Sequence, residues 1–187
     1  MLKKILQNNF YTLLLVVVGY LLIHSINNAL TGFLYLVPGA HLVHIPSGFK
    51  LLFVLVAGSL GAIGVVIASL IASVVYKFPG EYSLGLQLAM VNGLAPFLAR
   101  RWAIDNYDMR DDLSHITVKQ LLVMGLAFAF LNSGLNQAVL YWDGVQPHFL
   151  DGLVVMLIGD ITGAYIVFVL FKLLTKKLAN TDESEKS

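Results

Sequence analysis

The chain has 187 residues, of which 58% are hydrophobic and only 12% are charged, and its mean hydropathy is +0.79. An average soluble domain carries about 25% charged residues, and a domain of this length cannot bury so much apolar surface in one core. Lipid must therefore be the solvent for much of the chain. The lack of cysteine excludes disulfides, thiolate metal sites and a cysteine nucleophile.

Apolar stretches of about 20 residues each predict six transmembrane helices. The expected spans are residues 10–27, 39–57, 59–76, 83–99, 118–140 and 149–174. The first resembles a signal sequence, but no small-residue cleavage site follows it, so we interpret it as an uncleaved span. The second is the weakest, because it contains Pro46 and Lys50. We expect one all-α transmembrane domain, residues 1–178, and a disordered polar tail, residues 179–187.

Local signals predict the connections between these spans. Glycines in residues 58–61 favour a tight turn between the second and third spans, and Pro-Gly at residues 79–80 favours another turn after the third. Residues 100–117 form the only long polar connection. Thr117 and Gln120 have the spacing of a capping box at the start of the fifth helix.

The distribution of positive charge predicts the orientation, because lysine and arginine are enriched in cytoplasmic loops. With six spans and a cytoplasmic N-terminus, ten of the twelve cations fall inside: Lys3, Lys4, Arg100, Arg101, Arg110, Lys119, Lys172, Lys176, Lys177 and Lys186. Only Lys50 and Lys77 fall on the opposite side. We therefore expect both termini in the cytoplasm of a bacterium and the spans in its inner membrane.

Small residues indicate where helices touch. Gly64, Ala68 and Ala72 recur every four residues along one face of the third span, and such a face lets a neighbouring backbone approach closely. Packing within the bundle is the main interpretation, and a dimer face is the alternative.

Asp160 is the only acidic residue that this assignment places near mid-membrane. It lies about eleven residues into the sixth span, roughly 15 Å from either surface. An ionised aspartate there costs about 2.5–3.5 kcal/mol, so it must be protonated, paired or in a wet cavity. Gly159 and Gly163 flank it and leave room for a neighbouring helix or a ligand. Two interpretations stay open, a structural clasp between helices and a site for a ligand, a proton or an ion.

Three asparagines lie at similar depth. Asn132 and Asn136 are one turn apart on the fifth span, and Asn92 lies in the fourth. Amides that hydrogen-bond between helices contribute about 0.6–2 kcal/mol each, which makes helix association their simplest role. Together with Asp160 they instead predict one ligand pocket lined by three spans.

The histidines gather toward the predicted outer side, and His41 and His44 have a spacing compatible with metal binding on a helix. With few carboxylates nearby and no cysteine, they are weak metal candidates, and we expect no metal and no cofactor. Interfacial histidines without a special role are the simpler interpretation.

Motifs of common enzyme classes are missing, including the Walker loop, GxSxG and HExxH. Beyond one short loop there is no basic surface for nucleic acid. We therefore expect a non-enzymatic protein that does not bind nucleic acid.

Several short motifs resemble the first type of bacterial membrane-associated sensor domain. They are Pro46-Ser-Gly48 before a short apolar span, the small-residue helix at residues 61–73, the sequence NGLAPFLARR at residues 92–101, Trp142 in an outer loop, and Gly159-Asp160-x-x-Gly163. The resemblance covers about residues 46–174. That family usually has eight spans and an output domain, so here it implies that the signal passes to a separate partner.

Length and topology also resemble the substrate-binding subunits of energy-coupling-factor vitamin transporters, although no vitamin-binding residues can be matched. The leading expectation is a small membrane protein with a sensor-like bundle that binds a small ligand or signals to a membrane or cytoplasmic partner. The alternatives are a substrate-binding subunit of a small-metabolite transporter and a structural or assembly subunit of a membrane complex.

Overall fold

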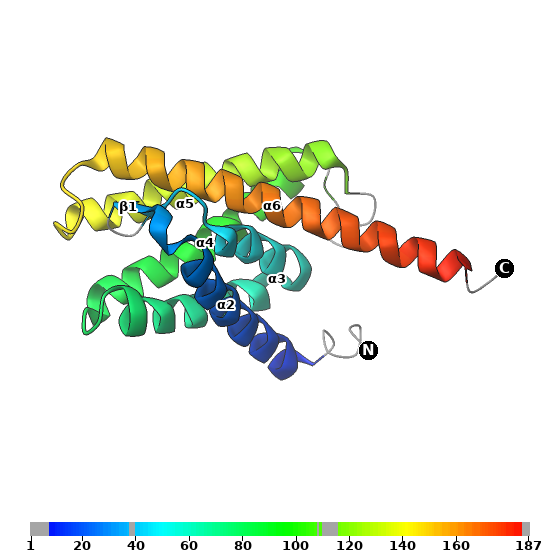
Figure 1. Ribbon diagram of the computed structural model, residues 1–187, viewed down its shortest axis with the longest axis horizontal. Helices are drawn as coiled ribbons and strands as arrows, with labels where there is room; N and C mark the ends of the chain where they lie inside the picture. The colour runs from blue at the N-terminus through cyan, green and yellow to red at the C-terminus, as the bar shows by residue number, and fades with distance from the viewer. Residues whose placement is uncertain (1–7, 38–39, 108, 110–115, 185–187) are drawn as a thin grey trace.

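The computed structural model describes residues 8–37, 40–107, 109 and 116–184, and it is a bundle of long helices (Figure 1). In chain order the elements are α2 (Asn9–Thr31), the short 3₁₀ helix η1 (Gly32–Leu34), β1 (Tyr35–Val37), β2 (Ala40–His41), α3 (Ile45–Ala72), the π-helix η2 (Ser73–Lys77), α4 (Tyr82–Asn106), α5 (Val118–Trp142) and α6 (Phe149–Ser184).

Five helical stretches in the described part of the chain are long and apolar enough to cross a membrane. Large apolar side chains cover the outside of the bundle, among them Leu22, Ile63, Leu98, Phe130 and Leu170. In water such a surface would be costly, whereas lipid solvates it. The expectation of a helical membrane protein is confirmed at this level.

Helix α3 lies at the centre and contacts α2, α4 and α6, while α5 packs between α4 and α6 (Figure 1). The predicted small-residue face of α3 packs on α2. A Cβ at Gly64 would lie 2.6 Å from Val16, and Ala68 and Ala72 are buried beside Tyr20. This face therefore serves packing within the bundle.

The second and third expected spans form one helical element that is broken at Gly58, where φ is +57°. A Cβ at Gly61 would collide with the backbone carbonyl of Phe53, eight residues earlier. Residues eight apart in a straight helix are separated by about 12 Å, so the chain folds back at the glycine. The first part, residues 45–57, is only about 20 Å long, which is too short to cross a bilayer alone. The count of six full spans is therefore not confirmed.

The second expected span also begins later than predicted, because β1 and β2 form a short antiparallel hairpin before it. This hairpin packs against the middle of α6, where Gly159 and Gly163 have no side chains. The amide of His44 donates to the carbonyl of Gly159 over 3.2 Å, and the hydroxyl of Thr162 donates to the carbonyl of Leu42 over 3.0 Å. The room beside the two glycines is thus filled by backbone, not by a ligand.

Most predicted boundaries are close to the observed ones. The capping box of Thr117 and Gln120 is confirmed, and Gly80 turns the chain between η2 and α4 with φ of +87°. Helix α4 continues to Asn106 and α6 to Ser184, so α6 extends into the stretch expected to be a disordered tail. Lys3, Lys4, Arg110 and Lys186 lie outside the described residues.

Candidate functional site

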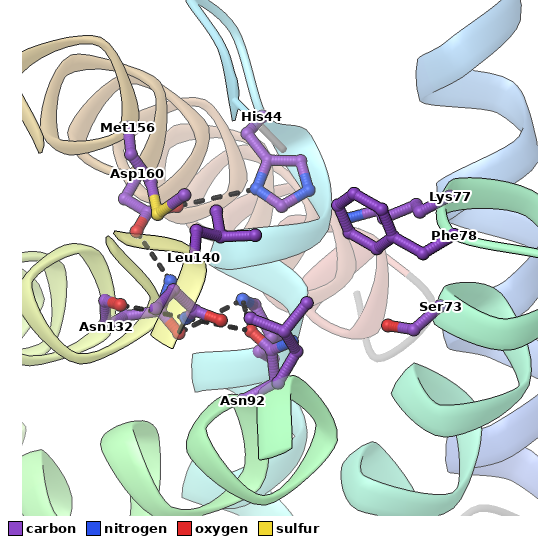
Figure 2. Close-up of a pocket in the computed structure, with 12 residues that line it drawn as sticks. His44, Ser73, Lys77, Phe78, Asn92, Asn132, Leu140, Met156 and Asp160 are labelled. Atoms are coloured by element: carbon purple, nitrogen blue, oxygen red, sulfur yellow. Dashed lines mark hydrogen bonds and ion pairs between the residues drawn. The ribbon is translucent and has the colours of Figure 1, made fainter. Parts of the chain in front are cut away.

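A small polar cavity lies between α3, η2, α4, α5 and α6 (Figure 2). Its volume of about 30 Å³ is enough for about one water molecule or one small ion. The lining residues are His44, Lys50, Ser73, Lys77, Phe78, Leu88, Asn92, Asn132, Asn136, Leu140, Met156 and Asp160. All four residues that the sequence nominated for a pocket, Asn92, Asn132, Asn136 and Asp160, are therefore brought together.

The carboxylate of Asp160 is fully buried and accepts hydrogen bonds at both oxygens. Oδ1 accepts from the hydroxyl of Ser47 and lies 3.4 Å from Nδ1 of His44. Oδ2 accepts from Nδ2 of Asn132 over 2.6 Å and from the hydroxyl of Ser133 over 3.1 Å. Since both oxygens are occupied, Asp160 joins α6 to α5 and to the start of α3.

The ammonium group of Lys50 is the cationic counterpart, and this side chain is only 1% exposed. It donates to Oδ1 of Asn92 over 2.8 Å and to Oδ1 of Asn132 over 3.3 Å. It also lies 5.7 Å from the centre of the Phe128 ring, within the range of a cation–π contact. The orientation argument assigned Lys50 to the outer side; in the structure its ammonium group is buried within the bundle.

Asn132 connects the two charges, because its Nδ2 donates to Asp160 while its Oδ1 accepts from Lys50. Asn136 donates to the carbonyl of Asn132 over 2.8 Å and to its Oδ1 over 3.1 Å, and Asn92 donates to the hydroxyl of Ser69 over 2.7 Å. A buried ion costs several kcal/mol unless it is paired and hydrogen-bonded. The relay through Asn132 meets that requirement for Lys50 and Asp160 without direct contact between them.

The π-helix η2 supplies the other end of the cavity. Such a bulge changes the direction of side chains along a helix and is frequent at functional sites. Ser73 and Lys77 come from η2, and Phe78 caps it. The ammonium group of Lys77 points into the cavity beside Phe78 (Figure 2). Among the described residues, the side chain of Lys77 has no hydrogen-bond partner and no ion pair.

An apolar cluster supplies part of the cavity lining. Leu88, Leu140 and Met156 belong to it, together with Ala40 from the hairpin, and Phe78 packs against them. The polar groups of the cavity therefore lie beside an apolar wall.

His44 has a specific role that the sequence did not suggest. Ser47 has one hydroxyl proton and gives it to Asp160, so Nδ1 of His44 carries a proton and donates to the Ser47 oxygen at 2.8 Å. The ring of His41 stacks on the ring of His44, with centroids 6.1 Å apart.

Metal binding by this histidine pair has little structural support. The stretch is not helical, and no three His, Cys, Asp or Glu side chains gather within the described part of the chain as a metal site requires.

Sequence reasoning missed Lys50 and Lys77 as site residues, because both were counted only as cations that indicate the orientation of the chain. The signal was present for Lys50, which precedes the apolar residues 51–57 and lies inside an expected span. An ionisable residue within a span indicates a functional site by default. Ser47 gave no such signal.

No family model matches the chain, and neither a curated protein nor a solved structure does. The resemblance to sensor domains therefore rests on the sequence motifs alone, and the geometry of the cavity is the basis for a functional proposal.

Proposed function

We propose that this chain is a small, non-enzymatic receptor of the bacterial inner membrane, which binds a small ligand in the polar cavity and signals to a partner protein. The observation that carries the proposal is the network of Lys50, Asn132 and Asp160, two opposite charges buried around a cavity. Replacing a buried ion pair by apolar residues is often neutral or stabilising, so stability alone does not require this arrangement.

The network also explains how binding is transmitted. Lys50 belongs to α3, Asn92 to α4, Asn132 to α5 and Asp160 to α6. A ligand that takes a hydrogen bond from any one of them changes the contacts of all four helices. Differential contact of this kind is what allows a ligand to shift a conformational equilibrium.

The size of the cavity favours a receptor over the transport alternative. Pockets for drug-sized molecules are about 300–1,000 Å³, roughly ten times the volume found here or more. A vitamin-sized substrate does not fit, whereas an ion or a molecule of a few atoms does.

We further propose six membrane segments with both termini in the cytoplasm, and the fold-back at Gly58 supports this topology. It makes the part of α3 before the glycine a half-length segment that runs from the middle of the membrane to the cytoplasmic side. The hairpin of β1 and β2 then lies in the outer half, and the residues that follow it, Leu42 and His44, are hydrogen-bonded through their backbone to α6.

Asp160→Asn tests the receptor role, because it keeps the shape of the side chain and removes its charge. The variant is introduced into a strain without the chromosomal gene. Growth, the signalling response and the amount of the protein in the membrane are then compared with those of wild type. The proposal predicts a folded protein that fails to complement. Full complementation by Asp160→Asn would leave the carboxylate as a structural clasp and refute its receptor role.

A further inference from the structure

The charges that line the cavity do not balance. Asp160 is its one carboxylate, and the relay through Asn132 pairs it with Lys50. Lys77 adds a second ammonium group. The cavity therefore carries one positive charge in excess.

The hydrogen-bonding groups around the cavity have the same bias. No described residue accepts a hydrogen bond from the three N–H donors of the Lys77 ammonium group, and none is bonded to the hydroxyl of Ser73. Lys50 uses two of its three donors. Both oxygens of Asp160 are already occupied, so no carboxylate oxygen is left for a cation. An unpaired, partly buried ammonium group is costly, and a counter-ion relieves that cost.

We propose that the cavity binds a monovalent anion of about the size of chloride between Lys77 and Lys50. The inference rests on the receptor function proposed above and names the class of its ligand. The volume of about 30 Å³ excludes larger anions, and the apolar side chains of Leu88, Leu140 and Phe78 that line the cavity lower the local polarity, which strengthens the attraction.

The test is the thermal unfolding of the purified full chain in detergent while sodium gluconate is replaced by sodium chloride. Sodium concentration and ionic strength stay constant. Specific binding raises Tm saturably, by about 3–6 °C at ten times the Kd for a chain of this length. Sodium bromide is expected to act in the same way.

Variants locate the effect. Lys77→Met is expected to abolish the chloride dependence, and Lys77→Arg to keep it. Lys119→Met is the matched control, because Lys119 is exposed on the first turn of α5 and does not line the cavity. Asp160→Asn removes the opposing charge and is expected to lower the chloride concentration at half-saturation, which keeps the test decisive if Lys77→Met does not fold.

Two results would overturn the proposal: no saturable chloride effect in the wild type, or an equal effect in folded Lys77→Met. A stabilisation by sodium or potassium that Asp160→Asn abolishes would identify a cation site instead. The two proposals fail separately. A chain without chloride dependence, whose folded Asp160→Asn variant still fails to complement, remains a receptor for another ligand. Chloride binding with full complementation leaves an anion site without a receptor role.

Discussion

Replacing Asp160 by leucine is predicted to destabilise the bundle more than the loss of any other single polar side chain. The change removes the acceptor for Ser47, Asn132 and Ser133, and it leaves the buried ammonium group of Lys50 without a counter-charge. Removing one partner of a buried ion pair costs about 3–5 kcal/mol. This exceeds the cost of one lost interhelical hydrogen bond, because several donors converge on the same carboxylate.

At about 2–4 °C per kcal/mol for a chain of this length, the expected decrease in Tm is roughly 10 °C. Thermal unfolding in detergent measures it for Asp160→Leu, for Lys50→Leu and for the double variant. If Asn132 couples the charges, the double variant loses less stability than the sum of the single variants. Additive losses would refute the coupling, and a Tm of Asp160→Leu within about 1 °C of wild type would refute the network itself.

Two further predictions concern packing and topology. Gly163→Ala puts a Cβ against the backbone of His44 and is expected to lower Tm by several degrees. Gly134→Ala is the control: its Cβ meets nothing within 4 Å, and the change is expected to raise Tm because it removes a glycine from a helix. Equal effects of the two variants on Tm would contradict the close approach at Gly163. Because the chain has no cysteine, single cysteines can be introduced and labelled in intact cells. Glu81→Cys is expected to react with a membrane-impermeant reagent, and Asn106→Cys is expected to stay protected. The reverse pattern would contradict the proposed orientation.

The polar positions of the site could be found from the sequence because each interrupts an apolar span. Polar side chains such as Asp160 and Asn132 are costly at membrane depth unless they are hydrogen-bonded. In the structure Nδ2 of Asn132 donates to Oδ2 of Asp160 over 2.6 Å. Depth along separate helices was thus enough to predict that they share a pocket. Depth alone could not show which atoms meet.

Lys50 shows why the remainder of the site was missed. Lys50 lies within the expected span of residues 39–57, but hydropathy averages over about 20 residues and does not reveal which side chains a single lysine contacts. The hairpin of β1 and β2 moves the start of α3 to the middle of α6, and this brings Lys50 to the level of Asn92. Such tertiary placement leaves no periodic signal. The glycine of the fold-back, Gly58, was recognised as a turn, but a turn does not reveal that the segment before it is only half a span.

The position of α3 also indicates where in the cavity the proposed anion is expected to bind. A helix that starts within the membrane presents unpaired amide groups and a partial positive charge at its first turn, which commonly faces an anion. In this chain the amide of Ile45 bonds to Asn27 over 3.0 Å, and the hydroxyl of Ser47 bonds to Asp160. The carboxylate of α6 thus occupies the position that a bound anion takes at other broken helices. Because Asp160 neutralises the start of α3, the excess positive charge lies with Lys77 at the end of η2. The proposed anion is expected to bind there.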